Sequence, residues 1–201
     1  MPRAMPDRPH VCVFCGSSTG SRPAYADAAR RVGSTLAQRG LGLVYGGGRV
    51  GLMGVMADAA LAAGGRVIGV IPEPLATKEL AHTGLTELRV VGTMHERKAL
   101  MAGLSAGFLA LPGGVGTFEE FFEILTWAVL GLHCKPVGLL NVEGYYDPLR
   151  ALLDHAVAER FVRPEHRALV TVSDQPEALA TELLSIIPPS SGPRWIDLEQ
   201  T

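Results

Sequence analysis

The sequence lacks the features that mark membrane, secreted and nucleic-acid-binding proteins. No uninterrupted apolar run reaches the length of about 20 residues that a transmembrane helix needs. The segment 1–9 has no apolar core, so we expect neither a signal peptide nor a membrane anchor. The formal net charge of −2 is neither the basic footprint of a nucleic-acid-binding protein nor the composition of an acidic disordered chain. We therefore expect a cytoplasmic protein with no membrane and no nucleic-acid partner.

Cysteine is scarce, and no pattern of metal ligands accompanies it. The three cysteines, Cys12, Cys15 and Cys134, cannot all pair with one another. Cys12 and Cys15 have the C-x-x-C spacing of redox and zinc sites, but both lie in the apolar run 11–15, where an odd separation places their side chains on opposite faces of a strand. The six histidines form no H-x-x-x-H pair and no cluster with the cysteines. We therefore predict small buried cysteine side chains, no structural metal and no cofactor.

The sequence is rich instead in short apolar runs that alternate with helical patterns. At 201 residues, of which 47% are hydrophobic, the chain is long enough for one domain that buries most of its apolar surface. Six apolar runs are predicted to be fully buried parallel strands, at residues 11–15, 41–45, 66–71, 108–111, 137–141 and 169–172. Helical patterns lie between most of them, at residues 24–39, 51–63, 93–105, 117–130, 148–160 and 175–186.

This alternation predicts an α/β fold, a single doubly wound Rossmann-like domain with a mainly parallel sheet and helices on both faces. Ligands bind such sheets at the carboxyl ends of the strands, and every glycine cluster of the chain follows a strand. The segment 72–91 breaks the alternation, because it is a long connection that carries Glu79, His82 and a short strand-like run at 87–91. Loops of this length are usually functional. We expect the domain to span residues 9–187, with disordered termini at 1–8 and 188–201.

A match to the G-x-G-x-x-G pattern, from Gly46 to Gly51, follows the second predicted strand. With Glu73 beyond the next strand, at about the spacing of a ribose-binding acid, the match alone indicates a dinucleotide cofactor. However, it follows the second strand rather than the first, and the chain has a second glycine cluster but no room for a separate substrate domain. A tight turn that serves one mononucleotide, with Gly47 in contact with it, fits better. Close packing of the helix on the strand is the alternative.

Gly16, Ser17 and Ser18 follow the first predicted strand in the same way. Gly16 and the two hydroxyl groups are candidates to contact the sugar or the phosphate of a ligand. They are equally suited to cap the helix that is predicted after Pro23. The residues alone favour neither role.

The segment 112–120, P-G-G-V-G-T-F-E-E, places a glycine turn after an apolar strand and two carboxylates in the helix that follows. Gly113, Gly114 and Gly116 allow consecutive N–H groups to point at one anion, and a helix beginning near Thr117 adds further donors. The helix dipole contributes only about 0.3–1 kcal/mol. We therefore expect such a phosphate site to recruit cations as well, and the segment 94–98, M-H-E-R-K, is a candidate source.

The same segment contains Thr117 and Glu120 in the T-x-x-E spacing of a capping box. Taken alone, this spacing favours a cap. Its position directly behind the glycine turn favours instead a carboxylate that faces the sugar of the ligand. Glu119 and Glu123 are expected to complement the helix end or to face solvent.

A second T-x-x-E sequence, at Thr93 and Glu96, predicts the start of another helix. Arg97 and Lys98 then fall in its first turns, where cations oppose the helix dipole at a total cost of about 0.5–2 kcal/mol. Local rules are broken most often at functional sites. Arg97 is the better candidate for chemistry, because its planar fork can hold a phosphate or a base edge.

Together, the segments 94–98 and 112–120 make the sequence similar to the LONELY GUY (LOG) family, the cytokinin riboside 5′-monophosphate phosphoribohydrolases, from about Val11 to Leu184. The family pattern is P-G-G-x-G-T-x-x-E with an M-x-x-R-K segment. The resemblance implies hydrolysis of the N-glycosidic bond of an N6-modified AMP, a small-molecule nucleotide monophosphate, to the free base and ribose 5-phosphate. Family members are often labelled lysine decarboxylases, but none of the three lysines has the context of a cofactor Schiff base in a large fold.

The resemblance also implies roles for individual residues. Glu120 would stabilise the positive charge that develops on the sugar, or activate water, as in glycoside hydrolysis. Arg97 would anchor the nucleotide or polarise the leaving base. The residues expected to bind the phosphate are Gly113, Gly114, Gly116 and Thr117, and those expected to line the nucleotide are Met94, Lys98 and Glu79.

Two further functions fit the same residues. One is a nucleosidase that acts on unmodified AMP or on another nucleotide monophosphate, and the other is a nucleotide-binding carrier or sensor without turnover. Release of adenine from AMP at a rate that matches an N6-modified nucleotide would favour the nucleosidase. Binding without any release of base would favour the carrier.

The helix predicted at 117–130 is apolar nearly all round. A helix that packs on one face of a sheet buries only one stripe of its surface. We therefore expect a homodimer, or a larger even assembly, in which a second copy covers the other stripe.

Overall fold

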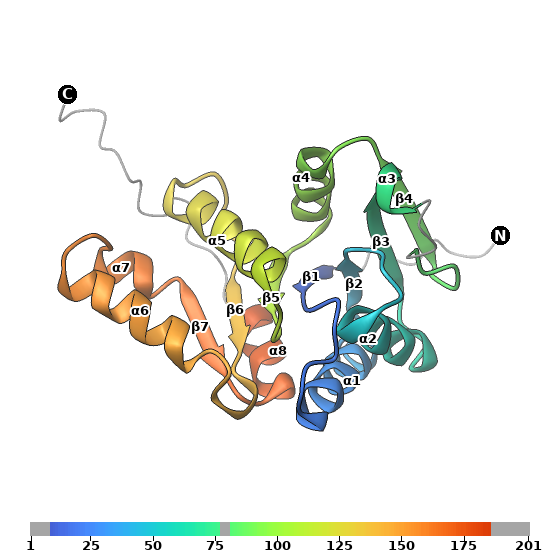
Figure 1. The fold of residues 1–201 in the computed structure, drawn as a ribbon, viewed down its shortest axis with the longest axis horizontal. Coiled ribbons are helices and arrows are strands. Elements are labelled where there is room, and N and C mark those ends of the chain that lie inside the picture. Colours follow the sequence, from blue (N-terminus) through green and yellow to red (C-terminus); the bar gives the residue numbers. More distant parts are fainter. Residues whose placement is uncertain (1–8, 77–80, 186–201) are drawn as a thin grey trace.

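Parallel strands form the centre of the structure (Figure 1). The computed structural model describes residues 9–76 and 81–185, so the termini predicted at 1–8 and 188–201 lie outside the described residues. Within the described residues, one seven-stranded sheet has the spatial order β4-β3-β2-β1-β5-β6-β7. Its strands are β1 (His10–Phe14), β2 (Gly42–Tyr45), β3 (Val67–Pro72), β4 (Glu87–Val91), β5 (Gly107–Ala110), β6 (Val137–Leu140) and β7 (Val170–Ser173). All neighbouring strands are parallel, which confirms the predicted α/β class.

Helices cover both faces of this sheet, as the sequence predicts (Figure 1). The first face carries α1 (Pro23–Gln38), α2 (Gly51–Ala62) and α8 (Pro176–Ser185). The second face carries α4 (Met94–Leu104), α5 (Val115–Val129) and α6 (Asp147–Ala158). Three short elements have no counterpart in the sequence-based prediction, namely α3 (Glu73–Leu75), the 3₁₀ turn η2 (Val142–Gly144) and α7 (Pro164–Arg167).

The predicted strands and main helices agree with the observed ones to within two residues at each end. The expectation that all six predicted strands are fully buried is wrong for β7, in which only Val170 is buried. The physical reason is position, because β7 is an edge strand with a neighbour on one side only. The strand-like run predicted at 87–91 is β4, the other edge of the sheet, where side chains alternate between half-buried and exposed.

Side chains of β1 alternate between two separate hydrophobic cores. Val11 and Val13 pack with α1 and α2, whereas Cys12 and Phe14 pack on the other face with α4 and α5. Cys15 lies in the first core, so the structure confirms that Cys12 and Cys15 are buried on opposite faces, and both are free. Among residues 9–76 and 81–185, no helix is long and apolar enough to cross a membrane.

The strand order creates one crevice in the sheet. From β1 the chain runs outward through β2 and β3 to β4, and it then returns to the other side of β1 as β5. The connections that follow β1 and β5 therefore diverge, and the carboxyl ends of these two central strands are where a doubly wound sheet accommodates a ligand.

Gly33 on α1 lies where α1 comes close to α2, and replacing it tests this packing. A Cβ at Gly33 would overlap the backbone carbonyl oxygen of Met56. Overpacking of this kind typically costs about 1–3 kcal/mol, and the better helix propensity of alanine offsets less than about 1 kcal/mol of it. We therefore expect Gly33→Ala to lower the free energy of unfolding by about 1–2 kcal/mol, measured by urea denaturation.

Gly103→Ala is the matched control for this prediction. Gly103 is exposed on α4, and a Cβ there would meet no atom within 4 Å. The same substitution should raise the stability there by about 0.5–1 kcal/mol. Equal effects of the two substitutions would contradict the close contact between α1 and α2.

Candidate active site

A cleft with a volume of about 250 Å³ opens at the carboxyl ends of β1, β2 and β5. It therefore lies at the crevice that the strand order creates. The end of β1, three loops and the helices α2, α4 and α5 line it, with Val13, Phe14, Cys15, Gly16, Ser17, Gly46, Met53, Arg97, Gly114, Val115, Gly116, Thr117 and Glu120. Six of these were not predicted as site residues, namely Val13, Phe14, Cys15, Gly46, Met53 and Val115. The signal available for them was their position at a strand end or in the first turn of a helix.

The first turn of α5 forms one wall of the cleft. Gly114 is the N-cap of α5 and supplies no side-chain cap, so the N–H groups of Val115, Gly116 and Thr117 have no partner within the helix. A Cβ at Gly114 or at Gly116 would meet no atom within 4 Å, so both glycines leave the approach to these donors open. The arrangement is an anion site of the kind found at helix N-termini.

The capping interpretation of Thr117 and Glu120 is wrong. The helix starts at Val115, two residues before the predicted start, because Gly114 adopts an extended conformation and serves as the N-cap. Thr117 is therefore inside the first turn, where it is 4% exposed, and Glu120 lies one turn farther along. Glu120 is four residues from Gly116, so the two share one face of the helix about 6 Å apart along the axis.

The loop after β1 forms another wall of the cleft. The N–H of Gly16 donates to the carbonyl of Pro112 at 3.1 Å, which ties this loop to the glycine turn after β5. Ser17 lines the cleft. The N-cap of α1 is Arg22 and has no side-chain cap, so the alternative in which Gly16, Ser17 and Ser18 cap that helix is not what forms.

The glycines after β2 serve mainly close packing. A Cβ at Gly46 would overlap Nη2 of Arg97, so this glycine admits the guanidinium into the cleft. Gly47 has a φ of +73° and faces the side chains of Ile71 and Leu88, so it is Gly46 and not Gly47 that lines the cleft. A Cβ at Gly51 would overlap the backbone of Ser17.

Gly113 likewise allows close packing and does not line this cleft. A Cβ there would overlap the side chain of Thr117 and approach the backbone nitrogen of Gly16 to 2.9 Å. Gly113 instead borders a second cavity of about 210 Å³, which shares Gly16, Ser17 and Gly114 with the first.

Arg97 and Glu120 face each other inside the cleft. Nη1 of Arg97 lies 3.5 Å from Oε1 of Glu120, and the side chains are only 12% and 11% exposed. This distance brings the charges together but is too long for a hydrogen bond. Nε of Arg97 donates to the carbonyl of Val70 at 3.1 Å, so the end of β3 holds the guanidinium in place. Because the two groups share no hydrogen bond, both can bond to a ligand in the cleft that they line.

Burial raises the pKa of Glu120, although the guanidinium of Arg97 acts in the opposite direction. A carboxylate with a raised pKa is a stronger base near neutral pH than an exposed one. Burial also raises the pKa of the Cys15 thiol, with a further contribution from Glu120. Cys15 therefore stays protonated and is a poor nucleophile, although it lines the same cleft.

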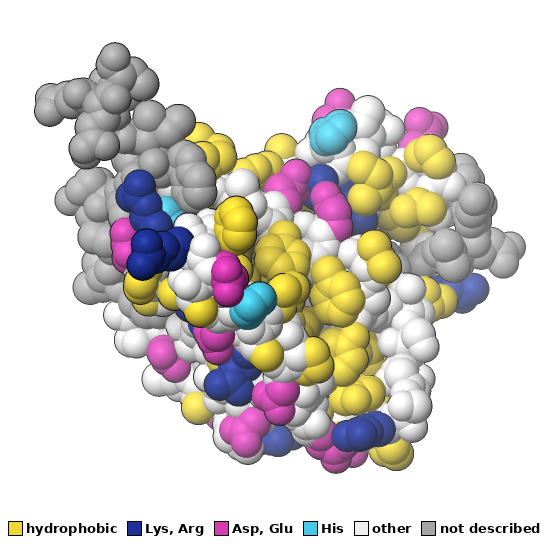
Figure 2. Space-filling model, turned by 60° about the vertical axis from the view of Figure 1, so that its left-hand side comes forward, with side chains coloured by type: hydrophobic (Ala, Val, Ile, Leu, Met, Phe, Trp, Pro, Cys, Tyr) yellow, Lys and Arg dark blue, Asp and Glu magenta, His cyan; other side chains and the backbone are white. Residues whose placement is uncertain are grey.

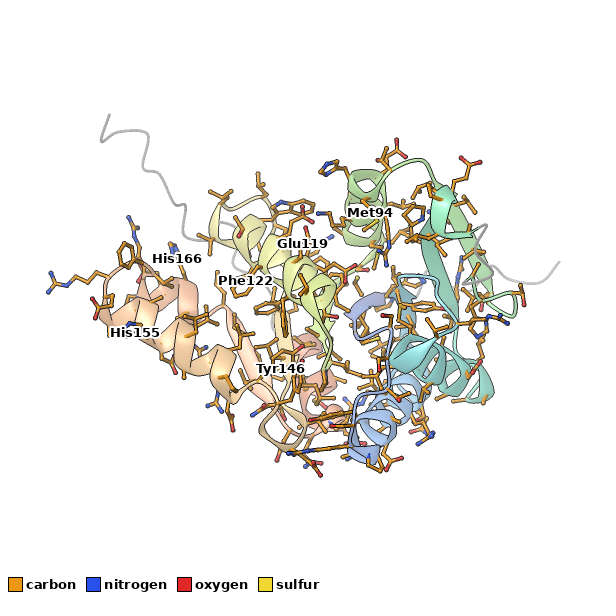
Figure 3. The ribbon with its side chains drawn as sticks, in the orientation of Figure 1. Met94, Glu119, Phe122, Tyr146, His155 and His166 are labelled. Carbon is orange, nitrogen blue, oxygen red and sulfur yellow. The ribbon has the colours of Figure 1, made fainter. Side chains whose placement is uncertain are left out.

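Lys98 lies outside the cleft, in a cluster of charges between α4 and α5. Its Nζ lies 2.6 Å from Oε1 of Glu119 and 2.9 Å from Oε1 of Glu123. Glu119, whose side chain is 51% exposed, faces solvent as expected and also binds Lys98. The expectation that Glu123 serves the helix end or faces solvent is wrong, because its side chain is only 22% exposed and binds Lys98 as well. Figure 3 shows Glu119 on the side of α5 that faces α4, with Met94 at the start of α4.

The start of α4 agrees with the sequence-based prediction. The N–H of Glu96 donates to Oγ1 of Thr93 at 3.1 Å, and Oε2 of Glu96 accepts from the N–H of Thr93 at 3.2 Å, so the predicted capping box is confirmed. Met94 is 43% exposed and its sulfur lies 3.8 Å from Nη1 of Arg97. Glu79 lies outside the described residues. Within the part of the chain that is described, no three His, Cys, Asp or Glu side chains are grouped as metal ligands would be.

Known proteins are similar to this chain in sequence or in fold. A family model described as "Possible lysine decarboxylase" matches residues 53–183. The probable cytokinin riboside 5′-monophosphate phosphoribohydrolase LOGL9 of Oryza sativa subsp. japonica is 53% identical over 178 residues, which are 89% of this chain and 78% of that protein. The cytokinin riboside 5′-monophosphate phosphoribohydrolase of Rhodococcoides fascians is 55% identical over 171 residues, 85% of this chain and 86% of that protein.

Among solved structures, the molybdenum cofactor binding protein from Rippkaea orientalis aligns with a TM-score of 0.68 and 23% identity. The alignment covers 90% of this chain and 98% of that one. Similarity at this level of identity supports the fold and carries no information about the ligand.

Glu120→Gln is expected to stabilise the protein at neutral and alkaline pH. The pKa of Glu120 is raised in the folded state, so the stability that its neutral form provides is complete below the unfolded pKa of about 4.3. That stability is lost as the pH rises through the raised folded pKa. Glutamine mimics the neutral carboxyl at every pH. Thermal unfolding between pH 4 and pH 8 should therefore show a gain in melting temperature that grows with pH.

Glu119→Gln is the control for this prediction. It removes an ion pair with Lys98 from a half-exposed carboxylate, so it should cost up to about 1 kcal/mol and bring no gain at high pH. A Glu120→Gln protein that is less stable than the wild type at pH 8 would mean that the attraction to Arg97 outweighs the effect of burial.

Proposed function

The chain belongs to the LONELY GUY (LOG) family of cytokinin riboside 5′-monophosphate phosphoribohydrolases, and from that premise we propose that the cleft between Arg97 and Glu120 is its active site. The protein is a hydrolase that cleaves the N-glycosidic bond of an N6-modified AMP and releases the free base and ribose 5-phosphate. The observation that carries the assignment is a buried carboxylate and a buried guanidinium, 3.5 Å apart, one helical turn from an open anion site.

The 5′-phosphate binds at the start of α5 in this proposal. The N–H groups of Val115, Gly116 and Thr117 point out of the helix end, and Ser17 lines the same cleft. No lysine lines the described cleft, and its one described cation, Arg97, is already held by the carbonyl of Val70. Backbone donors and the helix end therefore provide most of the phosphate recognition.

The ribose then lies beside Glu120. Cleavage of the bond between C1′ and the base leaves positive charge on the sugar, as in glycoside hydrolysis. The carboxylate of Glu120 stabilises this charge and takes a proton from the water molecule whose oxygen bonds to C1′. The departing base keeps the electron pair of the broken bond and takes up a proton from solvent water, and Glu120 returns the proton of the attacking water to solvent, so one water is consumed in all. Arg97, which stays charged at every physiological pH, donates a hydrogen bond to the base and cannot be the acid itself.

The lysine decarboxylase description does not fit the described lysines. A Schiff-base lysine needs a lowered pKa and an open site around its amine. Burial would lower the pKa of Lys98, but its bonds to Glu119 and Glu123 outweigh that effect and raise it. Burial lowers the pKa of Lys135, but its Nζ donates to the carbonyl of Ala102 at 2.8 Å, so no open site surrounds the amine. Neither lysine lines the cleft.

Glu120→Gln tests the assignment of the catalytic carboxylate. Glutamine keeps the size of the side chain but cannot accept a proton from water or balance the charge on the sugar. We expect kcat to fall by about 10²–10⁴, with a smaller change in KM, in an assay that measures release of the base from isopentenyladenosine 5′-monophosphate.

Glu119→Gln makes the same change one residue away, outside the cleft, and should keep kcat within about twofold. Near-normal release of base by the Glu120→Gln protein would overturn the assignment. The test is independent of folding, because Glu120→Gln is expected to be at least as stable as the wild type at the pH of the assay.

We also propose that the enzyme is a cytoplasmic homodimer. A cavity of about 340 Å³ separates α5 from α6 and α7, and its lining is mostly apolar, with Phe122, Leu125, Thr126, Val129, Leu130, Leu153, Phe161, Val162, His166, Arg167 and Val170. Phe161 is 80% exposed and Leu130 is 44% exposed. Figure 2, which brings the α6 and α7 side forward, shows hydrophobic side chains gathered near the middle of this face. A second copy of the chain would bury these hydrophobic side chains. The cytoplasmic location is supported by the three free cysteines, which fit a reducing compartment.

Light scattering at micromolar concentration should therefore give the mass of a dimer, and Phe161→Asp should give a monomer. A charge in place of this exposed ring disrupts an apolar interface but costs an isolated subunit little. Leu152→Asp is the control, because Leu152 is 59% exposed on α6 and does not line the cavity. A wild-type protein that is monomeric in this measurement would contradict the dimer.

A further inference from the structure

Three consecutive carbonyl groups hold the turn that leads into α5. The carbonyl of Leu111 accepts a hydrogen bond from the hydroxyl of Tyr146 at 2.5 Å. The carbonyl of Pro112 accepts from the N–H of Gly16 at 3.1 Å. The carbonyl of Gly113 accepts from the hydroxyl of Tyr145. Two neighbouring tyrosines from the segment after β6 thus bind the turn on either side of Pro112, and Figure 3 shows Tyr146 beside the segment that leads into α5.

The hydrogen bond from Tyr145 orients a backbone N–H group of the turn, and the hydrogen bond from Tyr146 does not. A trans peptide points its carbonyl and its N–H in opposite directions, so a fixed carbonyl at Gly113 also fixes the N–H of Gly114. The carbonyl of Leu111 precedes a proline, which has no N–H, so the bond from Tyr146 orients no donor. Gly114 borders both cavities, and it starts the row of free donors at the helix end.

A turn made of glycines needs such an outside constraint. Gly113 and Gly114 restrict their own backbone angles less than any other residue would, so a ligand that had to order them would lose affinity. The hydroxyl of Tyr145 supplies this order before the ligand arrives. It does so across 32 residues of sequence, from a residue that lines the second cavity and not the first.

Tyr145 is itself held in place by an unusual turn. Glu143 has a φ of +48°, and Gly144 follows with a φ of +75°. The left-handed conformation is unfavourable for a residue other than glycine, and an ion pair of 3.0 Å between Glu143 and Arg22 accompanies it here. The ring of Tyr145 also packs edge-on against Tyr25 and Tyr146, at centroid distances of 5.7 and 5.1 Å. Strained turns of this kind are found most often near functional sites.

We propose that Tyr145 is a positioning residue of the nucleotide site, whose hydroxyl orders the turn 113–114 so that its donors meet the 5′-phosphate. The proposal rests on the proposed function for the identity of the ligand. Tyr145 contacts no substrate atom. It acts through the peptide between Gly113 and Gly114, and its effect is confined to ligands that carry the phosphate.

Tyr145→Phe tests the proposal, because it removes the hydroxyl and keeps the ring. We expect KM for isopentenyladenosine 5′-monophosphate to rise about 3–10-fold, the effect of one lost hydrogen bond, with kcat within about twofold of the wild type. The inhibition constant of ribose 5-phosphate should rise by the same factor. The slow hydrolysis of the riboside, which has no phosphate, should be unchanged.

If Tyr145 only stabilised the fold, Tyr145→Phe would lower kcat and leave KM unchanged, because the substitution would reduce the amount of folded enzyme. Unchanged KM and inhibition constant in Tyr145→Phe would overturn the proposal. Tyr45→Phe is the control, since the Tyr45 hydroxyl is buried without a hydrogen-bond partner in the described structure, and it should match the wild type.

If the wild-type protein released no base, the proposed function would fail, whereas calorimetric titration of wild type and variant with ribose 5-phosphate would still decide the role of Tyr145.

Discussion

The pairing of β1 with β5 is the constraint on which the rest of the site depends. Its register sets Phe14 beside Ala110, and two residues farther along the N–H of Gly16 donates to the carbonyl of Pro112. This bond joins two glycine loops that are nearly 100 residues apart in the sequence, and the cleft opens where they meet. The site is therefore a product of the strand order, which returns the chain to the centre of the sheet after β4.

A buried carboxylate is the second constraint, and it opposes stability. Burying a charge is costly unless it is paired and hydrogen-bonded, and Arg97 compensates Glu120 only in part, because the two groups lie too far apart to share a hydrogen bond. Burial raises the pKa of Glu120 more than Arg97 lowers it, so the charged carboxylate costs the folded protein some stability. The raised pKa also makes the carboxylate more basic, and the missing hydrogen bond to Arg97 leaves it available for a ligand. The feature that lowers stability is thus the one that makes Glu120 reactive, as is common in active sites.

The sequence predicts what neighbouring residues determine and misses what the fold brings together. Periodic apolar runs predict the strands and main helices to within two residues, and the capping box at Thr93 forms as its spacing predicts. The same spacing at Thr117 fails, because Gly114 starts the helix first. The bond from Lys98 to α5 spans 21 residues and that from Tyr145 to the glycine turn spans 32. Such contacts have no local signal, since only the order of strands determines them.

Phosphate-dependent release of a base from a nucleotide is the central claim, and chromatography of the released bases tests it most directly. The protein is incubated separately with isopentenyladenosine 5′-monophosphate, with its dephosphorylated riboside and with AMP. Each charge-assisted hydrogen bond to the phosphate contributes about 1.5–3 kcal/mol, so the loss of two should slow the riboside at least about 100-fold. We expect release of isopentenyladenine from the nucleotide, far less of it from the riboside, and slower release of adenine from AMP. Equal rates for nucleotide and riboside would contradict it.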